Sequence, residues 1–262
     1  MNRSGKTMMK PELKKQWWRD VRWDGCSIPL GNLQRCAVPA AEKIKLPEPV
    51  GWHKYAVPTI NQHGPSCCGQ AWANWFEMML RRYVGMAALQ PGEQIDGYAI
   101  WKRAREMFYD GKLTGGLFLG QGFAAMVELG IVPPDTTIID LYPDIEILIE
   151  ALQSTPCVQG HIVSKGWHEP SPVNGCLDHS KLPEPGDGGH ATCLMDPTRK
   201  EQWIFLASQN SWGPDYGLNG YFLMTYEYWS RCHIGEGPCT AKLPKGWEKW
   251  DGWKKHVTRN AQ

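Results

Sequence analysis

The sequence predicts an α+β fold, with helices in its first half and strands in its second half. Residues 67–83, CCGQAWANWFEMMLRRY, have the apolar spacing of a buried helix. After Pro156 the chain instead has short apolar runs, rich in residues that favour strands and separated by Gly, Pro and Asn. Its 262 residues, 42% of them hydrophobic, suffice for one large domain or two closely packed halves.

Each predicted helix has a start or stop signal nearby. Pro65 and Ser66 precede the first helix, Gly130 ends the third, and Pro143 precedes the fourth. The further helices are expected at 94–108, 121–129 and 144–153. The strands are expected at 157–163, 190–195, 202–208 and 220–226. The connection 164–189 is rich in Pro and Gly, and its length is typical of functional loops.

The two ends of the chain are predicted to be extensions of a central domain at 56–230. Residues 1–55 contain Trp17, Trp18, Trp23 and Trp52 without sustained periodicity. Residues 231–262 contain GWEKWDGWKK, with tryptophans three apart. We expect both ends to pack on the domain, and docking to a protein partner or an assembly is the alternative.

Composition indicates no charged macromolecule as a partner. With 28 basic and 27 acidic side chains the net charge is +1, so no global field attracts nucleic acid or anionic lipid. Residues 1–15 are polar and lack the apolar core of a signal peptide, and no segment has the length of a membrane span. Together with nine cysteines, an odd number, this favours a cytoplasmic or assembly-associated protein with reduced thiols.

Four side chains occur in the order that attack on an acyl carbon requires. Gln62 is a candidate oxyanion donor, and Cys67 or Cys68 is a candidate nucleophile at a helix start. His190 is the candidate base, and Asn210 would orient its ring. The sequence therefore predicts a thiol hydrolase.

Three segments that surround these residues resemble the papain-like cysteine peptidase family: NQHGPSCCGQAWA, GGHATCLMD and QNSWGPDYGLNGYF. The resemblance runs from about Pro58 to Tyr226. It implies a papain-like α+β fold, with a helical amino-terminal half, an antiparallel β carboxy-terminal half and the active-site cleft between them. It also implies peptide-bond hydrolysis through a Cys-His-Asn triad and a Gln oxyanion hole.

The resemblance leaves the identity of the nucleophile open. The family's oxyanion glutamine usually lies six residues before the nucleophile, which favours Cys68. The family also has a serine just before the nucleophile and a small residue two places after it, packed against the opposite half. Ser66 and Gly69 then favour Cys67, which is the choice made here, with Cys68 as the alternative.

On the substrate side, the resemblance implies main-chain contacts from Gly116 and Gly189, and Trp212 covering the His190–Asn210 hydrogen bond. The expected partner is a polypeptide substrate. Two other functions use the same residues or fold: an amidase or isopeptidase acting on cell-wall or side-chain amides, and a non-catalytic docking protein. No cofactor or metal is expected, because the Cys and His spacings match no tight zinc pattern.

Overall fold

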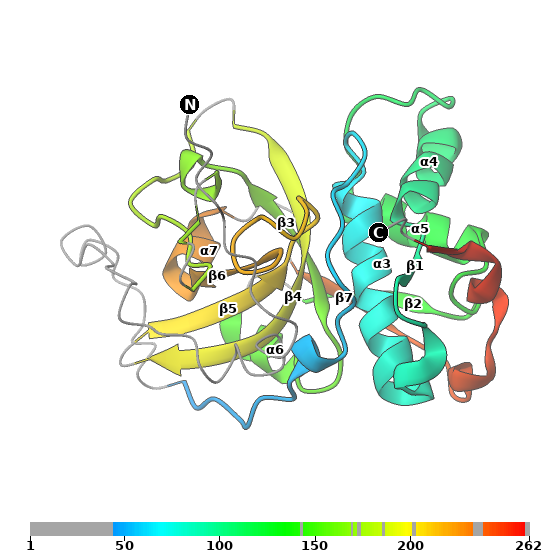
Figure 1. The fold of residues 1–262 in the computed structure, drawn as a ribbon, viewed down its shortest axis with the longest axis horizontal. Coiled ribbons are helices and arrows are strands. Elements are labelled where there is room, and N and C mark those ends of the chain that lie inside the picture. The colour runs from blue at the N-terminus through cyan, green and yellow to red at the C-terminus, as the bar shows by residue number, and fades with distance from the viewer. Residues whose placement is uncertain are drawn as a thin grey trace.

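Helix α3 (Cys67–Met79) forms the centre of the molecule, and all 13 of its residues are buried. Helices α4 (Gly97–Phe108) and α5 (Leu119–Glu128) pack on it from one side and strand β4 (Gly189–Lys200) packs on it from the other. The computed structural model describes residues 44–141, 144–168, 170–171, 174–184, 187–200, 203–232 and 238–259. Figure 1 shows the helices α3 to α5 in one half and most of the large sheet in the other, which confirms the predicted α+β, papain-like class.

The helical half follows the predicted elements closely. Strand β1 (Glu93–Ile95) is followed after one residue, Asp96, by helix α4. The Asp96 side chain caps this helix, because it accepts a hydrogen bond from the N–H of Ala99 at 2.9 Å. The first helix ends at Met79 and continues as a π turn, η5 (Leu80–Val84), although the spacing predicted one helix to residue 83. The shorter 3₁₀ turns are η4 (Trp52–Lys54), η6 (Met86–Ala88), η7 (Lys165–Trp167), η8 (Trp247–Lys249) and η9 (Gly252–His256).

The second half contains a six-stranded antiparallel sheet in the order β2-β7-β3-β4-β5-β6. Its strands are β2 (Thr137–Asp140), β3 (Cys157–Ile162), β4, β5 (Trp203–Gln209), β6 (Tyr221–Thr225) and β7 (Cys239–Lys242). Four of these are the predicted strands. Helices α6 (Ile145–Ala151) and α7 (Tyr226–Cys232) pack in this half, and α7 was not predicted.

Residues beyond 230 contribute strands to both halves. Strand β7 lies between β2 and β3 in the large sheet, and β8 (Val257–Arg259) pairs with β1. Trp247 and Trp253 are buried. The described residues after 230 thus take part in both sheets. The domain boundary at residue 230 stays a prediction.

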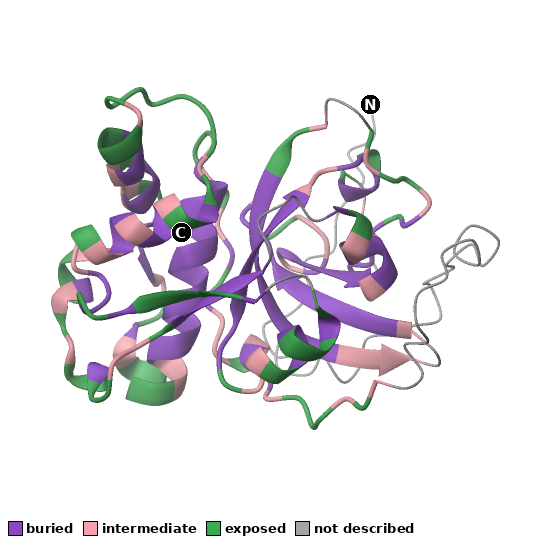
Figure 2. Cartoon of the chain, turned by 180° about the vertical axis from the view of Figure 1, so that it is seen from behind, coloured by how far each residue is buried: buried purple, intermediate pink, exposed green. Residues whose placement is uncertain are grey.

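Only part of the predicted amino-terminal extension is described, since Trp17, Trp18 and Trp23 lie outside the described residues. Trp52 is fully buried, and its indole N–H donates to the Leu152 carbonyl at 2.7 Å. Figure 2 shows that burial is concentrated in α3 and the central strands, whereas the outer loops are exposed.

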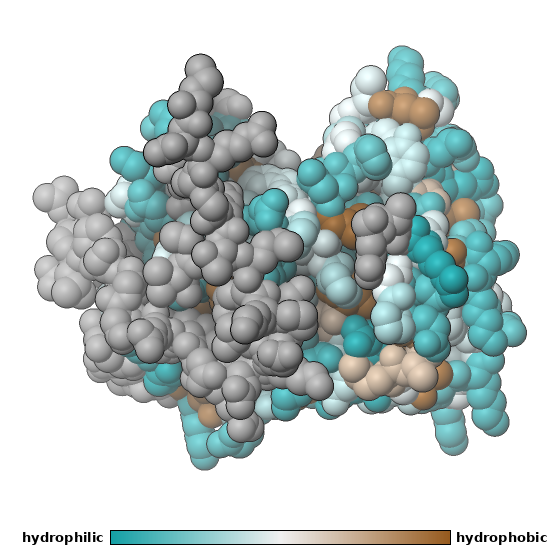
Figure 3. All heavy atoms as spheres, in the orientation of Figure 1, coloured by the Kyte–Doolittle hydropathy of each residue, from teal (hydrophilic) through white to brown (hydrophobic). Residues whose placement is uncertain are grey.

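In the described part of the chain no helix combines the length and the apolar character needed to cross a bilayer. The visible surface of the helical half is mainly hydrophilic, with scattered apolar residues (Figure 3).

Candidate active site

A cavity of about 310 Å³ brings together residues from both halves of the chain. Cys67 comes from the start of α3, and His190 comes from the start of β4. Gly116 and Gly189, the two glycines predicted to contact substrate, line the same cavity. The remaining lining residues are Tyr109, Leu117, Phe118, Leu119, Gly160 and Ala191.

The two adjacent cysteines face different surroundings. Cys67 is 9% exposed and lines the cavity. Cys68 is fully buried, and its thiol donates to the Phe118 carbonyl at 3.5 Å. A Cβ added at Gly122 of α5 would lie 2.6 Å from the Cys68 sulfur. The Cys68 side chain therefore packs against α5, and Cys67 is the cysteine that lines the cavity together with His190.

Gly69 allows helix α3 to cross close to helix α4. A Cβ at this position would lie 2.1 Å from the carbonyl oxygen of Gly97, so α3 and α4 cross with their backbones in close approach. The expected close packing is present, but its partner is α4 of the helical half, not the β half. The predicted start signal Ser66 precedes the helix without a side-chain capping hydrogen bond.

The hydrogen bonds of Asn210 determine which nitrogen of His190 carries a proton. Asn210 Oδ1 accepts from the backbone N–H of Ser211 at 2.8 Å, which identifies this atom as the oxygen of the amide. The same oxygen lies 2.6 Å from His190 Nε2. Nε2 must therefore be the donor, and in the neutral ring Nδ1 is left with a lone pair. This is the tautomer that a general base requires.

Two tryptophans enclose the His190 ring. The ring centroid of Trp212 lies 4.5 Å from that of His190, with 32° between the planes. Trp167, from the connection 164–189, is fully buried and meets His190 edge to face at 6.1 Å. Both rings pack against His190, which is buried. Trp167 has no signal in the sequence that separates it from the other tryptophans.

Burial acts on both reacting groups. It raises the pKa of the Cys67 thiol, and hydrogen bonding from the backbone of Ala191 and of the helix start opposes this rise. Burial also lowers the pKa of His190 to about 4, against the hydrogen bond to Asn210. Burial thus disfavours a Cys67 thiolate alone and a His190 imidazolium alone. A thiolate and an imidazolium formed together would offset this cost by their mutual attraction.

Gln62 is held beside the His190–Asn210 pair by the segment that follows Asn210. Its backbone N–H donates to the Ser211 carbonyl at 2.7 Å, and its side-chain oxygen accepts from the Ser211 hydroxyl at 2.6 Å. The amide nitrogen donates to the Gly64 carbonyl at 2.7 Å. An amide nitrogen has two hydrogens, so one remains for a further acceptor.

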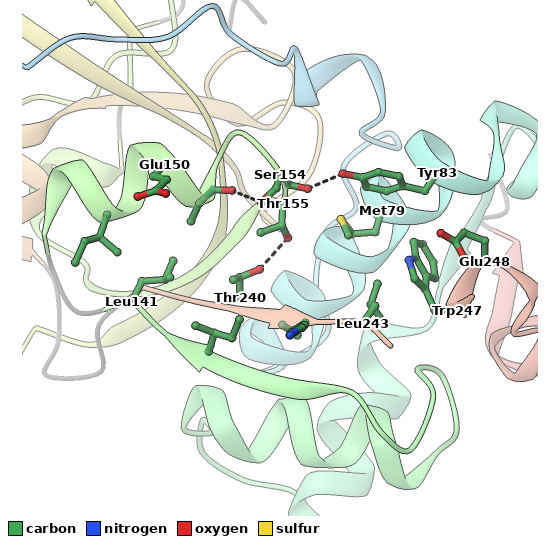
Figure 4. A pocket seen from close by; sticks show the side chains of 15 residues that line it. Met79, Tyr83, Leu141, Glu150, Ser154, Thr155, Thr240, Leu243, Trp247 and Glu248 are labelled. Atoms are coloured by element: carbon green, nitrogen blue, oxygen red, sulfur yellow. Dashed lines mark hydrogen bonds between the residues drawn. The ribbon is translucent and has the colours of Figure 1, made fainter. Parts of the chain in front are cut away.

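A second cavity, of about 490 Å³, lies at the other end of α3 (Figure 4). Met79 lines it, and Met79 follows Cys67 by 12 positions in the helix, a rise of about 18 Å. Tyr83 donates to the Ser154 carbonyl at 2.8 Å across its rim. None of the predicted site residues lines this cavity.

Several residues that line the first cavity were not predicted from the sequence. Leu117, Phe118 and Leu119 directly follow Gly116, so their place beside the predicted glycine was a usable signal. Tyr109 directly follows α4 and Gly160 lies in β3, and only the tertiary structure brings them to the site.

Comparisons with known proteins show a similarity at the level of the fold. No protein-family model matches the chain. Among solved structures, xylellain, a cysteine protease from Xylella fastidiosa, superposes with a TM-score of 0.61 at 19% identity, covering 77% of this chain and 88% of that one. The bromelain protease from Ananas comosus gives 0.55 at 14% identity, covering 76% and 100%. Procathepsin L2 from Tenebrio molitor gives 0.54 at 15% identity, covering 77% and 70%.

The chain therefore has the fold of the papain-like cysteine proteases. By sequence it is 34% identical over 95 residues to the uncharacterized peptidase C1-like protein L477 of Acanthamoeba polyphaga mimivirus. That match spans 36% of this chain and 29% of the mimivirus protein.

Proposed function

We propose that this protein is a cysteine peptidase that hydrolyses peptide bonds in extended polypeptides, with Cys67 as nucleophile and His190 as base. The observation that carries the proposal is the hydrogen bond from His190 Nε2 to Asn210, which leaves Nδ1 as the basic nitrogen of a ring that lines a cavity together with Cys67. The papain-like fold supports the same reaction.

In the proposed reaction, His190 Nδ1 takes the proton of the Cys67 thiol, and the sulfur attacks the carbonyl carbon of the substrate. The carbonyl oxygen becomes an oxyanion, which accepts hydrogen bonds from the Gln62 amide and from the backbone N–H of Cys67. His190 then gives its proton to the leaving amine as the C–N bond breaks. Water, deprotonated by His190, hydrolyses the thioester and restores the thiol.

Gly116 and Gly189 are proposed to bind the substrate main chain, because both line the cavity and neither has a side chain to obstruct an extended peptide. Trp212 covers the His190–Asn210 bond from the side, so that the imidazolium formed during the reaction keeps its acceptor.

Hydrolysis of an unfolded protein tests the proposal. We expect peptide fragments with wild-type enzyme and none with Cys67→Ala, while Cys68→Ala retains activity as the matched control. Loss of activity in Cys68→Ala alone would assign the reaction to the other thiol. Release of products from peptidoglycan or from isopeptide-linked peptides, without cleavage of unfolded protein, would instead indicate an amidase or isopeptidase.

A further inference from the structure

One side of the cavity is formed by residues 109–118, which we call the cleft wall. This segment connects α4 to α5 and contains no helix or strand. Its backbone enters the left-handed region at Asp110, Gly111 and Gly115, where φ is 51°, 73° and 83°. Tyr109 and Gly116 to Phe118 line the cavity. A segment of this kind keeps one shape only when other groups hold it.

Arg105, on the last turns of α4, donates hydrogen bonds to two carbonyls of the cleft wall. Its Nε donates to the Lys112 carbonyl at 2.6 Å, and its Nη1 donates to the Gly116 carbonyl at 3.3 Å. Its guanidinium carbon lies 3.7 Å from the ring centroid of Tyr109. The planar fork of an arginine is suited to two acceptors and an aromatic face at once.

Arg105 is only 6% exposed, yet within the described residues no salt bridge joins it to a carboxylate. A buried cation is costly unless other groups replace its hydration. Here main-chain carbonyls of the cleft wall do so. Arg103, on the same helix, differs: it is partly exposed and pairs with Glu106 and Glu128.

Other hydrogen bonds hold the two ends of the cleft wall. The N–H groups of Tyr109 and Gly111 donate to the Arg105 carbonyl at 3.0 and 3.2 Å. At the other end, Phe118 accepts from the Cys68 thiol at 3.5 Å and donates to Gln121 at 3.1 Å. None of the seven cysteines in the described part of the chain forms a disulfide, and none lies between α4 and α5. The Trp101 indole donates to the Gly115 carbonyl at 3.2 Å, and Tyr109 donates to Gln121 at 2.9 Å. Arg105 connects the two arms of the wall, because it bonds to Lys112 and to Gly116.

We propose that Arg105 is a positioning residue that holds the cleft wall in the shape that presents Gly116 to a substrate main chain. This inference rests on the proposed function, since it assigns Gly116 to substrate binding. Lysine at this position keeps the charge but cannot bond to both carbonyls and stack on Tyr109. The effect should therefore appear in Arg105→Lys as well as in Arg105→Gln.

The test compares two covalent probes of Cys67, an epoxysuccinyl peptide that extends along the wall and a small haloacetamide that does not. We expect Arg105→Lys and Arg105→Gln to slow labelling by the peptide probe about tenfold relative to the haloacetamide. Arg103→Gln, with an unchanged ratio, is the matched control. An unchanged ratio in both Arg105 variants, or equal slowing of both probes with a lower Tm, would overturn the proposal.

Hydrogen exchange keeps this test separate from the test of peptidase activity, because it needs no reaction at Cys67. We expect amides of residues 109–118 to exchange faster in Arg105→Lys, while those of α3 and β4 keep their protection. If wild-type enzyme labels but cleaves no peptide, the proposed function fails and the Arg105 inference stands on these two readouts. Unchanged exchange across the wall contradicts the inference even if peptides are cleaved.

Discussion

The orientation of the Asn210 side chain depends on its neighbour Ser211. The backbone N–H of Ser211 fixes the orientation of the Asn210 amide, and the amide then fixes the tautomer of His190. The hydroxyl of Ser211 also holds the side-chain oxygen of Gln62. The proposed base and the proposed oxyanion donor are therefore both held by the consecutive residues Asn210 and Ser211.

Substitution of Gln62 tests the oxyanion assignment. We expect Gln62→Ala to lower kcat by about 10²-fold with little change in KM, because the amide would act only on the charge that develops in the transition state. Steady-state kinetics on an extended peptide measure both constants. A raised KM with unchanged kcat would mean that Gln62 contributes only to substrate binding. Gln90→Ala, at a glutamine hydrogen-bonded far from the cavity, serves as the control.

At the scale of elements, the start of α3 depends on its crossing with α4. The two backbones approach at Gly69 and Gly97, and this contact sets the position of Cys67 two residues earlier. Because the helix is buried on every side, a shift at this crossing has no solvent-exposed face to relax into.

Gly69→Ala should destabilise the protein by about 2 kcal/mol. Alanine favours a helix by up to about 1 kcal/mol relative to glycine, but the added Cβ meets a backbone oxygen that no rotamer change can move. Gly120→Ala, also in a helix but with no atom near the added Cβ, should be neutral or slightly stabilising. Denaturant unfolding gives both values, and equal stability of the two variants would contradict the account.

The sequence predicted elements better than it predicted their contacts. The apolar spacing of 67–83 is a local signal, and it located α3 to within the π turn at its end. Strand β7 has only four residues and is placed by pairing with β2 and β3, which lie far away in the chain. For the candidate site, motifs predicted Gln62, Cys67, His190 and Asn210, and this assignment stays a prediction. Arg105 was not predicted, because the role proposed for it arises from the carbonyls it meets in the folded chain.

The carboxyl group of Glu77 is buried on α3, the helix that packs both on the other helices and on the large sheet. Glu77 accepts from the Ile95 backbone N–H at 2.6 Å, and its charge also affects Tyr221 and Cys193 of the sheet. Burial raises the pKa of Glu77 from 4.5 to about 8, against the nearby Arg81. The folded protein therefore keeps this group protonated at pH values where the unfolded chain releases the proton.

The free energy of unfolding should depend on pH through Glu77. Between pH 4.5 and about 8 the unfolded chain binds fewer protons at Glu77 than the folded protein, so this group makes the free energy of unfolding fall as pH rises. Glu77→Gln resembles the protonated acid and removes the titration. We expect similar stability of variant and wild type at pH 4, and a more stable variant at pH 8.5.

Denaturant unfolding at the two pH values measures this difference. Glu106→Gln, at an exposed glutamate of α4, is the control and should not reproduce the gain at pH 8.5. A Glu77→Gln variant whose stability relative to wild type is the same at both pH values would show that Glu77 is ionised in the folded protein.

Labelling with an epoxysuccinyl peptide, followed by peptide mass mapping, shows whether Cys67 and His190 act as nucleophile and base. We expect rapid modification of Cys67 in wild type and in Cys68→Ala, no modification in Cys67→Ala, and slow modification in His190→Ala. Modification of Cys68 instead, or no labelling by this probe or by a haloacetamide, would rule out Cys67 and His190 as the reacting pair.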